Sequence, residues 1–171
     1  GRHSNPQELL EILHDTAARL QNNAKYKQCI KVLTQALSLE IEVFGQDSNK
    51  AKESATKLIK MCNKLAVKML KIGRFEDCIE FIGNALSLTG PRYLPNLISL
   101  RIVTLNNASS CHRRLGDMEK ALSYAQDALN AGLKGEKDDS LACSHLNICC
   151  VYSQNGDHEE ALRHSMDALA A

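Results

Sequence analysis

The stretch Gly116–Leu129, GDMEKALSYAQDAL, returns forty residues later as Gly156–Leu169, GDHEEALRHSMDAL. Weaker copies occur twice nearer the amino terminus, so four stretches of the chain align. Each copy has a small residue, called the anchor here, and an alanine seven positions after it. The anchors are Cys29, Cys78, Ala121 and Ala161, and the alanines that follow them are Ala36, Ala85, Ala128 and Ala168. This agreement predicts four copies of one structural unit.

Each copy has the features of two antiparallel helices joined by a tight turn. Small residues allow two helices to approach closely where they cross. Gly73, Gly116 and Gly156 lie five residues before their anchors, where glycine supplies the left-handed conformation that ends a helix. Asp117 and Asp157 follow as expected caps of the second helix. We therefore expect helices over residues 7–21, 25–43, 48–72, 75–89, 92–115, 118–133, 137–155 and 158–171.

Composition agrees with an all-α fold. Hydrophobic residues make up 44% of the chain, but tryptophan is absent and aromatic residues are 4%, so the core is built from Leu, Ile, Ala and Cys. A formal net charge of +1 argues against a globally basic nucleic-acid binder. No run of eighteen apolar residues is present to span a membrane. Most of the seven cysteines fall on apolar or small positions of helical patterns and are expected to pack as small hydrophobic residues, which favours a reducing intracellular compartment.

The sequence CCVYSQNGDHEEALRHSMDAL, residues 149–169, resembles the tetratricopeptide repeat (TPR) family, with Cys149 in its small position and Tyr152 in its aromatic position. The third copy has His112 where tyrosine is usual, and the first has Ala24 where glycine is usual. The resemblance covers essentially the whole chain. It implies a right-handed α–α superhelix of about eight antiparallel helices in four repeats, in which the first helix of each repeat lines a concave groove.

The anchors are 49, 43 and 40 residues apart, which is longer than the family's usual repeat. This length, with the motifs ALSLEIEVFGQDS at 36–48 and TLNNASS at 104–110, resembles the extended repeats of kinesin light chains. We expect one TPR domain over residues 1–171, with repeats at 7–44, 48–90, 92–134 and 137–171. The last helix has no following partner in the sequence, so a fragment of a longer protein is expected.

A row of lysines marks the first helix of the second copy. Lys57, Lys60, Lys64, Lys68 and Lys71 fall on one side of a helix, and no acidic residue lies between Glu53 and Glu76. One interpretation is a solvated face, neutralised by acidic side chains of neighbouring helices. The other follows from the resemblance: the lysines face the groove and attract a negatively charged peptide. The basic residues assigned to that groove are Lys60, Lys64, Lys71, Arg113 and Arg114.

Asparagines occupy equivalent places on successive first helices. Asn107 and Asn147 lie fourteen residues before their anchors, and Asn63 and Asn106 lie fifteen residues before theirs. An asparagine amide can bind a peptide backbone unit because it both donates and accepts hydrogen bonds. In kinesin-light-chain-like grooves such asparagines resemble a ladder that holds an extended peptide. The alternative is a solvated or helix-bridging amide.

Catalytic motifs are not found, and no enzymatic activity, cofactor or metal is expected. His145 and Cys149 stand four residues apart on one helix, and Cys150, His158 and His164 are further candidate ligands. Cys149 already fills the small position of its repeat, however, and the vicinal thiols point to different faces.

The expected function is a cytoplasmic scaffold or adaptor, with cytoskeletal association among its settings. It binds an extended, acidic peptide segment of a protein partner, not nucleic acid or membrane. Two alternatives stay open: a regulatory or targeting module of a larger kinase or phosphatase, and self-association through the terminal helices.

Overall fold

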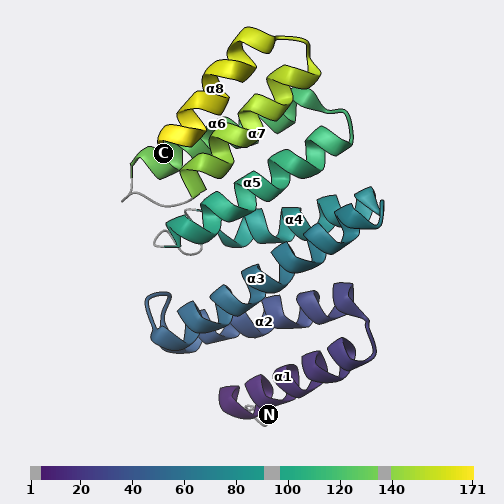
Figure 1. Ribbon diagram of the computed structural model, residues 1–171. Coiled ribbons are helices and arrows are strands. Elements are labelled where there is room, and N and C mark those ends of the chain that lie inside the picture. The colour runs from purple at the N-terminus through teal and green to yellow at the C-terminus, as the bar shows by residue number, and fades with distance from the viewer. Residues whose placement is uncertain (1–4, 91–96, 135–139) are drawn as a thin grey trace. The chain divides into compact units, whose positions relative to one another are not determined.

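The computed structural model describes residues 5–90, 97–134 and 140–171, and within these residues the chain forms eight helices and no strand (Figure 1). The helices are α1 (Pro6–Asn22), α2 (Tyr26–Phe44), α3 (Asn49–Lys71), α4 (Phe75–Leu88), α5 (Ile98–Arg114), α6 (Met118–Leu133), α7 (Ser140–Gln154) and α8 (His158–Ala170). The predicted all-α fold of helical repeats is confirmed. In the described residues, no helix is both long and apolar enough to cross a membrane.

The chain divides into two compact units, residues 1–62 and 63–171, and the boundary falls within α3. Most predicted helix ends agree with the observed ends to within two residues. Within the predicted helix 92–115, Leu97 is the N-cap and Ile98 is the first residue of α5. The predicted starts of the third and fourth repeats, at residues 92 and 137, lie outside the described residues.

The first unit contains the hairpin of α1 and α2. Its crossing point is formed by two small buried residues, and the Cys29 thiol donates a hydrogen bond of 3.3 Å to the Ala17 carbonyl. A polar contact joins the same helices, because His14 Nε2 lies 3.0 Å from Oε1 of the buried Glu40. The small anchor therefore brings the two backbones together, as predicted.

The hairpin turns repeat one backbone conformation. Gly73, Gly116 and Gly156 have φ values of 77°, 84° and 82°, and Ala24 holds the equivalent position with φ of 55°. After each of them, the next backbone N–H donates to the carbonyl five residues earlier, for example Asp117 to His112 at 2.9 Å and Lys25 to Leu20 at 2.8 Å. These bonds satisfy carbonyl groups that would otherwise be unpaired at the helix end.

The predicted aspartate caps are confirmed in the last two hairpins. The Asp117 carboxylate accepts from the backbone N–H of Lys120 at 3.2 Å, and the Asp157 carboxylate accepts from that of Glu160 at 3.3 Å. Each aspartate thus satisfies one unpaired N–H at the start of its helix.

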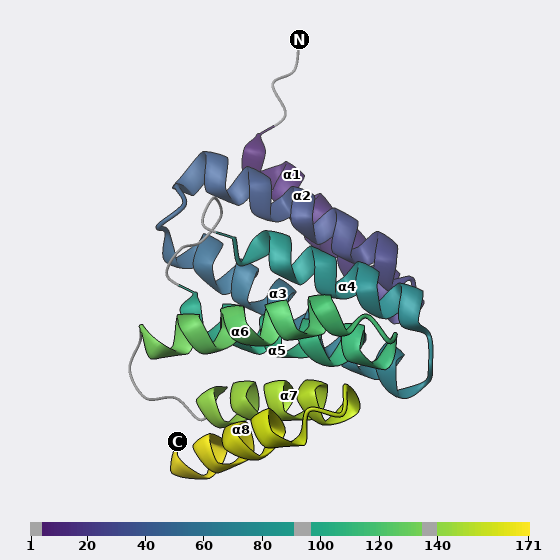
Figure 2. The same ribbon diagram turned by 90° about the horizontal axis from the view of Figure 1, so that it is seen from above.

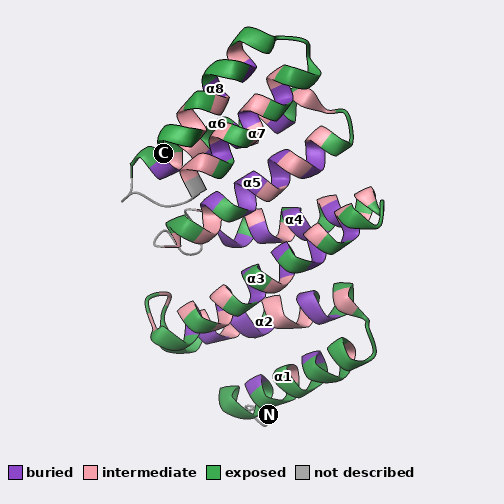
Figure 3. Cartoon of the chain, in the orientation of Figure 1, coloured by how far each residue is buried: buried purple, intermediate pink, exposed green. Residues whose placement is uncertain are grey.

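The second unit contains the hairpins α5–α6 and α7–α8, with α7 also packed against α6 (Figure 2). Buried residues run along most of α5, whereas α8 is largely exposed on its outer side (Figure 3). The anchors Cys78, Ala121 and Ala161 are all buried. Residues twelve positions before two of them, Ala66 and Ser109, are buried as well, and this matches the predicted close helix crossings.

Two buried cysteines differ from the expectation of packed thiols. A disulfide joins Cys78 of α4 to Cys111 of α5, and the two Cα atoms are 6.9 Å apart. The physical reason is that both residues are small buried side chains on adjacent helices, so their sulfur atoms face each other.

An aromatic pair recurs in both C-terminal hairpins with its members exchanged. His112 of α5 lies against Tyr124 of α6, with 5.3 Å between the ring centroids. In the next repeat Tyr152 of α7 stacks on His164 of α8 at 5.8 Å. His112 therefore fills the aromatic position, as the sequence predicted.

Candidate functional site

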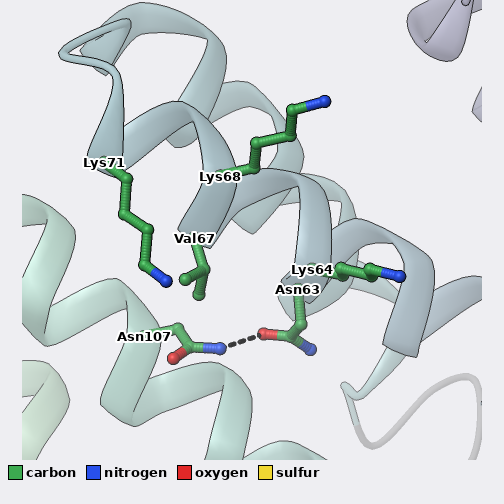
Figure 4. Close-up of a pocket in the computed structure, with 6 residues that line it drawn as sticks. All are labelled: Asn63, Lys64, Val67, Lys68, Lys71 and Asn107. Atoms are coloured by element: carbon green, nitrogen blue, oxygen red, sulfur yellow. Dashed lines mark hydrogen bonds between the residues drawn. The ribbon is translucent and has the colours of Figure 1, made fainter.

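A basic pocket lies within the second unit, between the carboxyl-terminal part of α3 and α5. It has a volume of about 480 Å³ and is lined by Asn63, Lys64, Val67, Lys68, Lys71 and Asn107. In Figure 4 the Lys71 side chain and Val67 extend from α3 towards Asn107, while Lys64 and Lys68 extend away from it. The pocket thus combines amine groups, amides and one apolar side chain.

The lysines of this pocket are exposed and carry no ion pair within the described part of the chain. Other cations nearby along the sequence are neutralised: Lys57 lies 2.7 Å from Glu53, and Arg74 contacts Asp77 closely. Lys64, Lys68 and Lys71 are three or four residues apart on one helix, and like charges at such spacing repel each other. An anionic ligand would relieve that repulsion.

The asparagines at the pocket floor bridge two first helices. Asn63 of α3 donates through Nδ2 to Thr104 Oγ1 at 2.8 Å, and Asn107 of α5 donates through its own Nδ2 to Asn63 Oδ1 at 2.8 Å (Figure 4). Asn63 is 7% exposed, so its amide is occupied by α5. Asn107 is half-buried and lines the pocket.

The same hydrogen-bond pattern recurs between α5 and α7. Asn106 donates to Ser144 Oγ at 3.1 Å and accepts from Asn147 Nδ2 at 3.1 Å. Ser110 in turn donates to Asn147 Oδ1 at 3.2 Å. The equivalent asparagines therefore do form a ladder, but it links successive first helices to one another. Of the two interpretations from the sequence, the helix-bridging amide describes all four asparagines, Asn63, Asn106, Asn107 and Asn147, and Asn107 also lines the pocket.

The pocket unites only some of the residues assigned to the groove. It brings Asn63, Lys64, Lys71 and Asn107 together and adds Val67 and Lys68. The assigned residues that do not line it are Lys60, Asn106, Arg113, Arg114 and Asn147. Lys60 and Arg114 are exposed, and Arg113 is half-buried. The spacing of Lys68 from Lys64 and Lys71 along one helix was a signal that could have assigned it.

The structure contains a second polar cluster that was not predicted from the sequence. Side chains of His145, His164 and Asp167 meet between α7 and α8, whereas Cys149, Cys150 and His158, which were weighed as ligands, are not part of it. The available signal was the spacing of His164 and Asp167, which places both on one face of α8.

Residues 100–171 match the family model described as Tetratricopeptide repeat. No curated protein matches the sequence.

Three solved structures are similar across nearly all of this chain. The crystal structure of BtubC (BKLC) from P. vanneervenii is 18% identical with a TM-score of 0.61, over 99% of this chain and 65% of that one. A Podosopora anserina putative kinesin light chain with nearly identical TPR-like repeats is 13% identical with a TM-score of 0.52, over 98% and 96%. MamA is 14% identical with a TM-score of 0.51, over 94% and 85%. Identities of this size show a shared fold. This chain spans less than two thirds of BtubC.

Proposed function

Because residues 100–171 match the tetratricopeptide repeat model and the chain shares the fold of such repeats, we propose that this protein is a scaffold that binds an extended, acidic segment of a protein partner. Stacked helical hairpins in general present extended binding surfaces to other proteins. The pocket between α3 and α5 is the proposed contact point.

The observation that carries the proposal is that three exposed lysines without ion pairs line one pocket with Asn107. Lys71 extends towards the Asn107 amide, and Lys64 and Lys68 extend away from it (Figure 4). Aspartate or glutamate side chains of a partner would pair with Lys64, Lys68 and Lys71. Asn107 uses one N–H for Asn63, and its carbonyl oxygen and second N–H are suited to one peptide unit. Val67 offers an apolar surface for a neighbouring side chain of the same segment.

Fluorescence polarisation with labelled acidic and neutral peptides of equal length tests this function. We expect the acidic peptide to bind more tightly, and its binding to weaken as salt rises, because exposed charges are screened. Lys64→Glu and Lys71→Glu should each weaken binding roughly fivefold to thirtyfold, since each removes one attraction and adds one repulsion of about 0.5–1 kcal/mol. Asn107→Ala should weaken binding while the helical circular dichroism signal stays unchanged.

Lys134→Glu is the matched control, because Lys134 is exposed, lies in the same unit and does not line the pocket. It makes the same change in net charge. Equal weakening by Lys64→Glu and Lys134→Glu would show that only net charge matters, and would end the assignment of the pocket.

Self-association is a second candidate function, favoured by the outer side of α8. Leu162, Met166 and Leu169 are 62%, 62% and 89% exposed and lie four and three residues apart, on one face of the helix. Sedimentation velocity across a hundredfold range of concentration should show a larger species that Met166→Glu abolishes. A constant monomer mass would exclude this function. A role as a module of a larger enzyme stays a prediction.

A cytoplasmic location also stays a prediction. The exposed thiols of Cys143 and Cys150 are typical of a reducing compartment, whereas the bond between Cys78 and Cys111 is typical of an oxidising one. Counting the free thiols of protein taken directly from cells would distinguish a reducing from an oxidising compartment.

A further inference from the structure

Three metal-ligand side chains converge between the two helices of the last hairpin. Nδ1 of His145 on α7 lies 3.1 Å from Nδ1 of His164 on α8, and 4.0 Å from Asp167 Oδ2, also on α8. All three ligand atoms lie within 4.8 Å of one another. His164 is 8% exposed, and the His145 side chain is 15% exposed, so two imidazoles face each other in a largely dry position.

We propose that His145, His164 and Asp167 bind a divalent transition-metal ion, Zn²⁺ above all, which clamps α7 to α8. This site is separate from the basic pocket and goes beyond the proposed function.

The spacing of the two ring nitrogens fits a shared ion. With metal–nitrogen bonds of about 2.0–2.1 Å, two ligands at tetrahedral or octahedral angles lie about 2.8–3.4 Å apart. The observed separation of the nitrogens is 3.1 Å. The Asp167 oxygen must come closer by under about 1 Å to reach the same ion. The Asp167 side chain is 45% exposed, so it has room to turn.

Two imidazoles and one carboxylate select the class of ion. Imidazole suits Zn²⁺, Cu²⁺ and Ni²⁺, whereas Ca²⁺ and Mg²⁺ prefer oxygen ligands. Three protein ligands leave a fourth position for water or for a side chain of a partner. Tyr152 stacks on His164 at 5.8 Å with its ring nearly parallel, which holds that imidazole in orientation.

The position of the proton on the His164 ring decides what must change when the ion binds. Arg163 Nη2 lies 3.2 Å from His164 Nε2, and a guanidinium can only donate, so Nε2 accepts and Nδ1 carries the proton of the neutral ring. His164 Nδ1 then donates this proton in a hydrogen bond to His145 Nδ1. Metal binding requires the lone pair of Nδ1, so the proton moves to Nε2 and Arg163 must turn away.

Neighbouring groups make this exchange feasible. The Arg163 side chain is 59% exposed, and its Nη2 is also bound to Glu160 Oε2 at 2.7 Å. Once Arg163 turns away, the Glu160 carboxylate can accept the Nε2 proton, as carboxylates do for metal-bound histidines. Burial, together with Arg163 and His145, lowers the pKa of His164, which favours the neutral ring.

Isothermal titration of untagged protein with ZnCl₂ at pH 7.5 tests the site. We expect one ion per chain, and a rise of at least about 5 °C in the thermal midpoint at hundredfold excess over the dissociation constant. His145→Gln and Asp167→Asn should each weaken binding at least tenfold. Arg163→Gln should strengthen it, because the donor that occupies His164 Nε2 is removed. Nitrogen-15 NMR of the imidazoles should show Zn²⁺ on Nδ1 of both rings.

His158→Gln is the matched control, since His158 is exposed on the same helix and outside the cluster. A Cys149→Ser/Cys150→Ser variant controls for thiol ligands. Both should bind Zn²⁺ as the unmodified chain does. The proposal is overturned if the unmodified chain binds less than about 0.3 equivalents at 100 µM Zn²⁺. The proposal is also overturned if His158→Gln and His145→Gln weaken Zn²⁺ binding equally, or if the Cys149→Ser/Cys150→Ser variant binds Zn²⁺ more weakly than the unmodified chain.

Discussion

Replacing Asn106 by alanine removes the centre of the amide ladder between α5 and α7. Asn106 is 8% exposed, donates to Ser144 Oγ at 3.1 Å and accepts from Asn147 at 3.1 Å. Two hydrogen bonds worth about 0.5–1.5 kcal/mol each are lost. Alanine regains roughly 0.6 kcal/mol through its higher helix propensity. We therefore expect the free energy of unfolding to fall by about 0.5–2.5 kcal/mol.

Part of the ladder survives this substitution. Asn147 Nδ2 also lies 3.4 Å from the backbone carbonyl of Asn106, so its amide keeps an acceptor. Ser144 is fully buried, and its hydroxyl loses a donor that water cannot easily replace.

A double-mutant cycle measures this contribution directly. Asn106→Ala, Ser144→Ala and the double variant are unfolded in urea and followed by circular dichroism at 222 nm. The coupling free energy should be about 0.5–1.5 kcal/mol. Asn130→Ala is the control, because Asn130 is an exposed asparagine inside α6. Asn130→Ala should leave the free energy of unfolding unchanged or raise it slightly. A coupling below about 0.3 kcal/mol, which is the error of additivity, would refute the hydrogen bond between Asn106 and Ser144.

Further predictions concern the turns, the caps and pH. Ala24→Gly should raise the free energy of unfolding by about 0.5–1 kcal/mol in urea titrations, because Ala24 has φ of 55° and glycine adopts it without strain. Asp157→Ala should lower it by about 1 kcal/mol through loss of the bond to the Glu160 N–H, whereas Asp157→Asn should retain most of it. Burial lowers the pKa of His112 in the folded chain from its ordinary value of 6.5. The contribution of His112 to the free energy of unfolding is therefore complete above pH 6.5 and is lost as the pH falls towards the lowered pKa. His112→Tyr should therefore reduce the loss of stability between pH 7 and pH 5; an unchanged loss would contradict the assignment.

The repeated asparagines were correctly aligned from the sequence, but the alignment allowed two interpretations, peptide-binding amides or helix-bridging amides. The equivalence of Asn63 with Asn106, and of Asn107 with Asn147, was visible in the sequence and holds in the structure. The periodicity of a helix places such residues on one face, but the same face meets both solvent and the next helix. Their hydrogen bonds therefore depended on the spacing between helices.

The sequence alone determined the turns between the helices and the aspartate caps, because those interactions join residues within about five positions of each other. The contacts between Asn63 and Thr104, between Cys78 and Cys111, and between His145 and His164 were decided only in the tertiary structure. They join residues 41, 33 and 19 positions apart. Such pairs depend on the register of one helix against another, to within a fraction of a helical turn, and the packing of many small side chains sets that register together.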